Sequence, residues 1–564
     1  MLRMESMKII RNPKYQFAFF LIILFIINVL QSKYTALWGD EAYYWVWSKD
    51  LAFGYFDHPP MVALWIKISS FFFDGELGVR FFSTISFSIL VLLIWSMIDI
   101  KNKWEYVWLY FLVIISVVFI NVYGFITTPD TPLLLFAALF LWSYKKFLKQ
   151  ENWQNTLLFG FSMAAMLYSK YHGVLIIAFL VLSNLSLLKS KRFWFAGIFG
   201  FILFIPHLYW QYLNDFPSFR YHLIERGNGS YSIENTLLHF VNQIAIVGIT
   251  FPVIYASFFK QKASNLFNKS LYFIVYGFIL FFFISSFSIS PQAQWTSVIL
   301  IAFIILGFPY FIAHQKARKW LIILGSIQFV LLMVIRIYLA NENLSPIPLE
   351  PHEASRWVQE LKDKTEGKPL VFTNSYRRAS IYNFYTGIKT HSFGILRGRK
   401  SQYNLGNFEN SLQHENIYAI GSYNDDAPLL FVYDDHEVHG KPIDDFTTFQ
   451  RVTCTINKER LDLKQNQTIN LNFTLKNPYD KSINLHSVKF VGVFQDKKGN
   501  ILAEIPLENI TKEELGPFRE KLLNTSFVVP NLNNEEGLTF RVAVEFYEFF
   551  AGYQGNKVKI KFEN

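Results

Sequence analysis

The chain of 564 residues is 52% hydrophobic and 18% aromatic, and only 17% of its residues are charged. This composition excludes an ordinary soluble protein, and the single cysteine, Cys454, excludes an intrachain disulfide. The net charge of +10 lies mainly in short segments between apolar blocks, with no basic stripe of interleaved aromatics, so we expect no nucleic-acid binding.

Apolar blocks near the ~20-residue length that crosses a bilayer recur through the first 340 residues. Because every backbone polar group must be bonded internally in lipid, these blocks predict a polytopic α-helical membrane core over residues 1–340. We expect about 11 spans, and at most about 13. They lie near residues 15–31, 78–98, 105–122, 131–148, 155–170, 172–188, 193–212, 236–258, 270–289, 294–313 and 319–340.

Basic residues are concentrated in every second connection between these spans. The connections at 101–103, 145–149, 189–192, 260–269 and 316–319 each hold two or three Lys or Arg. The positive-inside rule therefore places the N-terminus in the cytoplasm and residues 341–564 outside it. We expect a multi-pass protein of the plasma (inner) membrane, in contact with membrane lipid, with an extracytoplasmic C-terminal domain.

The pattern changes after residue 340. Residues 341–447 predict a soluble α/β unit, with helices at 354–366 and 379–385 and strands at 370–373 and 428–433. Residues 448–564 alternate between apolar and polar positions, which is typical of half-buried strands, and predict a β-sandwich-like domain. Its expected strands are 469–475, 488–494, 501–505, 538–547 and 557–562.

The first external loop, residues 32–77, contains the most informative stretch, Trp38–Pro60. Aromatic rings are favoured at a membrane surface because one end is apolar and the other wet. Carboxylates are not favoured there, so Asp40, Glu41 and Asp57 are functional candidates, together with His58. The simpler alternative is an interfacial amphipathic helix in which Asp40 and Glu41 are solvated caps.

Three motifs resemble those of the membrane-type glycosyltransferases that use polyprenyl-phosphate sugars, the glycosyltransferase-C superfamily. The resemblance is to the bacterial branch related to protein O-mannosyltransferases and to the lipid A aminoarabinose transferase. The motifs are Asp40–Tyr44 followed by Tyr55–Pro60, then Thr128–Pro132, then Arg220–Arg226. The lipid A branch often has Glu-Lys before its proline pair, whereas this chain has Asp57 and His58 there.

The resemblance implies an inverting sugar transfer at the extracytoplasmic face. The donor would be a polyprenyl-phosphate sugar, and the acceptor would be lipid A or another glycolipid, a polysaccharide or a protein. It also implies that Asp40 is the catalytic base, since this position in the first loop carries the base candidate of the family. Glu41 is then either a second carboxylate or a structural residue.

Transfer from a lipid phosphate also needs cations that neutralise the departing phosphate. Arg226 is the first candidate because a guanidinium matches phosphate oxygens and keeps its charge, and Arg220 and Lys170 follow. His58 and His222 are candidates for contacting the phosphate or, together with Asp57, for binding a divalent metal; we expect no other cofactor. The alternative role for these arginines is contact with lipid headgroups.

Two further positions have competing interpretations. Asp130 begins a predicted helix between two prolines, where a capping carboxylate is the expected role and a catalytic one is the alternative. Trp295 resembles the family's aromatic residue near the donor, and an interfacial anchor explains it equally well. A lipid or oligosaccharide transporter is the alternative function, although transporters bury polar groups near the bilayer midplane and these candidates lie at one surface.

Overall fold

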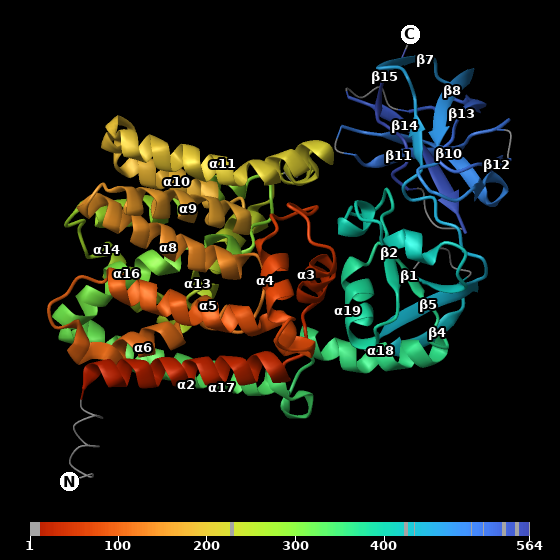
Figure 1. Cartoon of the computed structure of the whole chain (residues 1–564). Helices are drawn as coiled ribbons and strands as arrows, with labels where there is room; N and C mark the ends of the chain where they lie inside the picture. Colours follow the sequence, from red (N-terminus) through yellow and green to blue (C-terminus); the bar gives the residue numbers. More distant parts are fainter. Residues whose placement is uncertain are drawn as a thin grey trace. The chain divides into compact units, whose positions relative to one another are not determined.

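The computed structural model describes residues 12–225, 231–421, 427–433, 435–497, 499–510, 513–532, 537–547 and 552–562. The chain divides into two compact units, residues 1–352 and residues 353–564 (Figure 1). The expected boundaries at 340/341 and 447/448 stay predictions.

The first unit is helical, and each of the eleven apolar segments contains a helix. The long helices are α2 (Pro13–Tyr34), α5 (Gly75–Met97), α8 (Asp130–Lys149), α9 (Trp153–Ser169), α11 (Lys191–Leu213), α15 (Leu266–Ser285), α16 (Ile299–Ala313) and α17 (Gln315–Ala340). The shorter ones are α3 (Gly39–Lys49), α4 (Met61–Ser69), α6 (Val107–Ser116), α7 (Val118–Val122), α10 (Gly173–Ser183), α12 (Pro217–Arg220), α13 (Ile233–Ala245) and α14 (Phe251–Phe259).

Six of the described helices are long and apolar enough to cross a membrane, or seven if one bent pair is a single span. These six are α2, α5, α8, α11, α15 and α17. The other expected spans are shorter or broken; the segment 105–122, for example, is divided between α6 and α7 at Val117. The architecture expected from the sequence, a polytopic helical protein with a β-rich C-terminal domain, is confirmed, whereas the number of spans stays a prediction.

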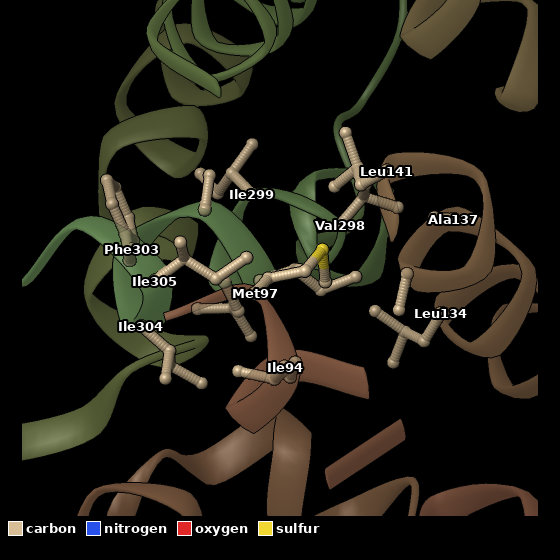
Figure 2. Packing of buried hydrophobic residues seen from close by; sticks show 14 of the residues in the cluster. Ile94, Met97, Leu134, Ala137, Leu141, Val298, Ile299, Phe303, Ile304 and Ile305 are labelled. Carbon is tan, nitrogen blue, oxygen red and sulfur yellow. The ribbon is translucent and has the colours of Figure 1, made fainter. Parts of the chain in front are cut away.

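The core of the first unit lies where α5, α8 and α16 meet. Helices α2, α5, α8, α9 and α11 pack against one another in that order, and α16 and α17 pack beside them (Figure 1). Figure 2 shows Ile94 and Met97 of α5 packed among Leu134 of α8 and Ile305 of α16. Van der Waals packing holds such helices together, because lipid is as apolar as the side chains and removes the usual hydrophobic driving force.

The bent pair is α13 and α14, whose axes meet at 92° across the break at residues 246–250. Gly248 lies in this break with a φ of +77°, and a Cβ there would meet Gln328 Oε1 of α17 at 2.4 Å. The same oxygen accepts the backbone N–H of Ile249 at 2.7 Å. An amide that the break removes from helical bonding is thus satisfied by the neighbouring helix, as a low-dielectric environment requires.

The loop of residues 32–77, which the sequence predicts to be external, contains two helices, α3 and α4. Helix α3 begins with Asp40 and Glu41 in its first turn and ends with Lys49 in its last, so its charges complement the helix dipole. Tyr43, Tyr44 and Trp47 are buried, and Trp47 stacks on Tyr55 with ring centroids 4.5 Å apart. The loop is therefore a packed part of the fold.

The second unit starts with α18 (Glu353–Lys364), α19 (Tyr376–Thr386) and a five-stranded sheet of order β2-β1-β3-β5-β4. Its strands are β1 (Leu370–Thr373), β2 (Thr390–Phe393), β3 (Ile417–Ile420), β4 (Leu429–Tyr433) and β5 (His436–Ile443). Strand β1 is parallel to both β2 and β3, and α19 connects β1 to β2. The predicted α/β unit is present.

The rest of this unit is a β-sandwich. One sheet has the order β11-β10-β14-β15-β7 and the other β13-β8-β6, and their inner faces meet where Phe527 stacks on Phe540 at 5.1 Å. The five expected strands correspond to β8 (Thr468–Lys476), β10 (Val488–Gln495), β11 (Ile501–Pro506), β14 (Thr539–Phe546) and β15 (Val558–Phe562). The remaining strands are β6 (Thr453–Thr455), β7 (Arg460–Leu463), β9 (Ile483–Asn484), β12 (Glu514–Leu515) and β13 (Glu520–Val528).

Candidate functional site

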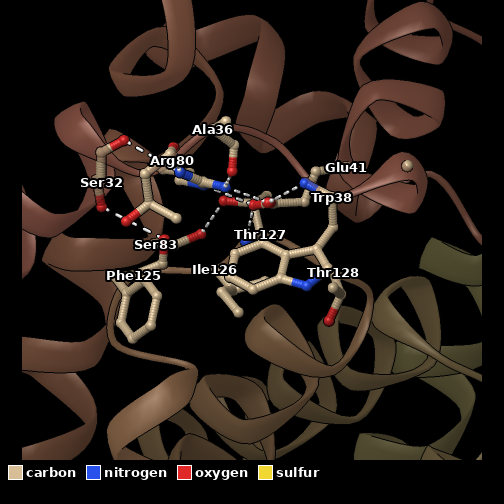
Figure 3. Close-up of polar contacts among 12 residues, drawn as sticks. Ser32, Ala36, Trp38, Glu41, Arg80, Ser83, Phe125, Ile126, Thr127 and Thr128 are labelled. Atoms are coloured by element: carbon tan, nitrogen blue, oxygen red, sulfur yellow. Dashed lines mark hydrogen bonds and ion pairs between the residues drawn. The ribbon is translucent and has the colours of Figure 1, made fainter. Parts of the chain in front are cut away.

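Glu41 and Arg80 form an ion pair at the base of the first external loop (Figure 3). Both side chains are fully buried, and Arg80 Nε donates to Glu41 Oε1 at 2.8 Å. Arg80 also donates to the main-chain carbonyls of Ser32, Thr35 and Ala36, at the end of α2 and just after it. The pair therefore fastens α3 to α2 and α5.

The Glu41 carboxylate also binds two backbone amides. Oε1 accepts the N–H of Thr127 at 2.8 Å, and Oε2 accepts that of Trp38 at 3.3 Å. Ser83 Oγ and Thr127 Oγ1 lie 2.6 Å apart in the same cluster (Figure 3). The segment that leads into α8 is thus held against the start of α3, and both oxygens of Glu41 are bound within the fold.

Asp40 precedes Glu41 but lies on another side of the helix. Its side chain is half-buried, whereas that of Glu41 is fully buried. Residues three or four apart share a helix face, so both acidic residues lie one turn from Tyr44, whose ring is 6.2 Å from that of His58. Of the two predicted carboxylates, Glu41 is the one that binds Arg80 and Thr127 inside the fold.

Lys170 and Asp130 form a second buried ion pair. Lys170 Nζ donates to Asp130 Oδ1 at 2.7 Å and to Oδ2 at 2.8 Å, and both side chains are over nine-tenths buried. Asp130 is the first residue of α8, with Pro129 at the cap position. Besides starting α8, the Asp130 carboxylate binds a lysine from the connection between α9 and α10, and whether Asp130 acts as a cap or as a site residue stays a prediction.

Asp57, His58 and His222 are brought together. His222 Nε2 donates to the carbonyl of Asp57 at 2.8 Å, and the rings of His58 and His222 are 6.0 Å apart. His222 also lies 5.8 Å from the ring of Tyr171, the neighbour of Lys170. Among the described residues, no group of three His, Cys, Asp or Glu is arranged to hold a metal ion.

These contacts close into a ring. Helix α3 contacts His58 through Tyr44, His58 contacts His222, and His222 contacts the Lys170–Asp130 segment through Tyr171. Asp130 lies three residues after Thr127, whose amide binds Glu41 of α3. We call the residues Asp40, His58, Asp130, Lys170 and His222 the charged ring.

The other candidates lie elsewhere or outside the described residues. Arg220 is exposed and pairs with Asp215, Nη2 to Oδ1 at 2.7 Å. Trp295 is buried, packs 5.9 Å from the ring of His172 and donates Nε1 to Gln292 Oε1 at 3.1 Å. Arg226, the first-ranked phosphate ligand, falls in the range 226–230, outside the described residues.

Sequence reasoning did not single out Arg80, the partner of Glu41, or His207, which donates from Nδ1 to the carbonyl of Phe53 at 2.7 Å. Both lie inside apolar helices, α5 and α11. A charged or imidazole side chain within such a segment is costly unless it has partners. The sequence signal that could have identified Arg80 and His207 is therefore their position within apolar segments.

Part of the chain matches a family of known activity. A family model described as dolichyl-phosphate-mannose-protein mannosyltransferase matches residues 57–210, which include Asp57, His58, Asp130 and Lys170 but not Asp40. No curated protein sequence matched the chain.

Two solved structures share its fold. ArnT from Cupriavidus metallidurans in the apo state is 12% identical, with a TM-score of 0.55, and the match covers 75% of this chain and 97% of ArnT. The same protein bound to undecaprenyl phosphate is 13% identical, with a TM-score of 0.50 and the same coverage of both chains.

The helices and the shared fold are those of a multi-pass membrane protein with an ArnT-like architecture. More narrowly, residues 57–210 are similar in sequence to the dolichyl-phosphate-mannose-protein mannosyltransferases.

Proposed function

We propose that the protein transfers a sugar from a polyprenyl-phosphate donor to a hydroxyl acceptor at the extracytoplasmic face of the membrane, with inversion at the anomeric carbon. The observation that carries the proposal is the charged ring, which gathers a half-buried carboxylate, a buried lysine and two imidazoles. The family match over residues 57–210 and the likeness to a structure that binds undecaprenyl phosphate support it.

Asp40 is the base in this proposal. Its carboxylate takes the proton of the acceptor hydroxyl as that oxygen attacks the anomeric carbon. The bond between this carbon and the phosphate oxygen breaks from the opposite side, and the bonding electrons leave with the polyprenyl phosphate. Glu41 stays bound to Arg80 and fixes the first turn of α3, which sets the direction of Asp40.

Lys170 is the cation that receives the departing phosphate. In the described structure its ammonium is neutralised by Asp130, so the donor phosphate would share or replace that carboxylate. His58 and His222 adjoin the same segment through Tyr171 and supply further hydrogen-bond donors. Arg226 and Trp295 are proposed to bind the sugar donor. Arg220 would have to release Asp215 before it could also bind this donor.

Asp57, His58 and His222 are the residues that would hold a divalent cation if transfer requires one. For His222 to be a ligand through Nε2, it would have to release the carbonyl of Asp57. The acceptor is a lipid A-type or other glycolipid, a polysaccharide or a protein. In each case the attacking group is a hydroxyl, so the role of Asp40 is the same.

The test is sugar transfer in proteoliposomes containing the full-length protein and a panel of undecaprenyl-phosphate sugars. Asp40→Asn should lower the rate by about 10²–10⁴-fold, the usual contribution of a general base. Asp50→Asn, a matched change at the exposed end of α3, should keep the wild-type rate. Near wild-type transfer by Asp40→Asn would exclude Asp40 as the base, and lipid movement without a covalent product would favour a transporter.

A further inference from the structure

Three carbonyls of the first external loop are held by three side chains that lie together in a later part of the chain. His207 Nδ1 donates to the carbonyl of Phe53 at 2.7 Å, Ser218 Oγ to that of Tyr55 at 2.9 Å, and His222 Nε2 to that of Asp57 at 2.8 Å. The acceptors are every second residue of the loop. The donors lie on α11, α12 and the π-helical turn Tyr221–Glu225.

The hydrogen bonds around a neutral His207 ring allow one tautomer. Because a carbonyl only accepts, Nδ1 of His207 carries the proton bound to Phe53, and Nε2 of the neutral ring is an acceptor. Tyr171 Oη lies 3.0 Å from this Nε2 and therefore donates to it. Burial raises the pKa of the Tyr171 phenol, which keeps the donated proton on the oxygen.

Gln211 completes the network. Its Nε2 donates to Tyr171 Oη at 3.0 Å and to Ser218 Oγ at 2.7 Å. Ser218 Oγ accepts this hydrogen bond and donates its own O–H to the carbonyl of Tyr55. Each polar group has a role consistent with its neighbours, and such fully satisfied buried networks rigidify the parts that they join.

The turn after α11 is shaped for this contact. Asp215 and Phe216 are consecutive non-glycine residues with φ of +63° and +51°, a conformation that costs free energy and persists only where surroundings enforce it. The turn brings Pro217 and Ser218 back toward the first loop, where both are buried. Backbone strain at this point accompanies the placement of Ser218.

We propose that Tyr171, His207, Gln211 and Ser218 form a clamp that positions the loop 53–58, and with it His58, relative to Lys170 for binding the donor phosphate. This inference rests on the proposed function. Tyr171 follows Lys170 directly, so the clamp joins the lysine segment to the loop through hydrogen bonds. Because the clamp uses only main-chain carbonyls of the loop, it fixes the path of the loop without using the side chains of Asp57 or His58.

The first measurement is the position of the loop in the full-length protein. Spin labels at Phe53→Cys and Leu157→Cys, whose native side chains are 58% and 41% exposed, report the distance between the loop and α9. The native Cys454 is buried and should not react with the label. Tyr171→Phe removes the hydroxyl that binds His207, and we expect the narrow wild-type distance distribution to broaden.

A matched control is Tyr272→Phe, which removes a hydroxyl bonded to the carbonyl of Phe258, away from the clamp. It should leave the distribution narrow. His207→Asn retains a donor near the position of Nδ1 and should restore much of the order that His207→Leu loses. Ser218→Ala, which removes one small group, gives a second variant should Tyr171→Phe fold poorly.

The second measurement is the affinity for undecaprenyl phosphate itself, free of sugar. Tyr171→Phe should weaken it at least tenfold, and Tyr272→Phe should not. A narrow distribution in both Tyr171→Phe and Ser218→Ala, or a broadened one with unchanged affinity, would overturn the clamp. If the wild-type protein does not bind undecaprenyl phosphate, the proposed function fails instead, and the label distances still decide whether the network holds the loop.

Discussion

Glu41 and Arg80, 39 residues apart in the chain, form an ion pair in which neither side chain is exposed to solvent. The guanidinium binds the carboxylate and three main-chain carbonyls, and the carboxylate binds two backbone amides. This pair fixes Glu41 within the fold, whereas its half-buried neighbour Asp40 stays the candidate base.

We expect Glu41→Gln to destabilise the first unit by about 3–5 kcal/mol, because it leaves the Arg80 charge buried without a carboxylate. Asp40→Asn should change stability by less than about 0.5 kcal/mol, as for most substitutions outside the core. Thermal unfolding of the two variants in the same detergent measures both effects. Equal losses would contradict the division of roles between these residues.

The Lys170–Asp130 pair should behave as a coupled unit. Lys170→Met leaves Asp130 buried without its partner and should cost about 3–5 kcal/mol. The double variant Lys170→Met/Asp130→Asn should recover part of that loss, and a double-mutant cycle from thermal unfolding gives the coupling energy. Additive single and double changes would show that the pair contributes nothing beyond its separate residues.

Arg220→Gln tests an exposed ion pair, for comparison with the buried Lys170–Asp130 pair. The side chains of Arg220 and Asp215 are 55% and 70% exposed, and surface pairs of this kind contribute about 0–1 kcal/mol. We expect little change in the unfolding temperature. A loss comparable to that of Lys170→Met would mean that the turn after α11 depends on this pair.

Glu409 should make the stability of the second unit depend on pH. It is fully buried, its carboxylate accepts the hydroxyls of Thr448 and Tyr479 at 2.7 and 2.8 Å, and burial raises its pKa to about 7. The folded state therefore retains a proton that the unfolded chain loses above about pH 4.5. Stability falls as pH rises from about 4.5 to about 7, by about 3 kcal/mol in total.

Glu409→Gln removes this titrating group, so the variant should lack that part of the pH dependence. Unfolding of the wild-type and Glu409→Gln proteins at pH 5 and pH 8 tests the sign. The difference between the two proteins should shift in favour of the variant at the higher pH. A shift in the opposite direction would mean that Glu409 is ionised in the folded state.

The helices were predictable because an apolar run of sufficient length has one stable backbone arrangement in lipid. Strands such as β10 and β14 followed from their alternation. Strand β13 did not, since its adjacent Leu522 and Leu523 blur the period, and it is defined by pairing with β8. The breaks that shorten α6 and α13 depend on contacts with other helices, which a local pattern does not contain.

The sequence was sufficient to predict which loops carry the candidate site, but not the role of each residue in them. Asp40 and Glu41 are neighbours in the sequence, and only the position of Arg80 on α5 separates their roles. Likewise, the position of Asp130 at a helix start did not reveal its ion pair with Lys170. Distant partners decide the roles of acidic residues, and pairing across about 40 residues is not visible in a single sequence.

The fit between Gly248 and Gln328 constrains how this protein can change. The glycine leaves room for the amide of Gln328, and that amide satisfies the N–H exposed where α13 and α14 separate. A larger residue at 248 would displace the glutamine, and a smaller one at 328 would leave a donor unsatisfied within the bilayer-crossing part of the fold. Positions 248 and 328 are therefore expected to vary together, or not at all, among homologues that share this fold.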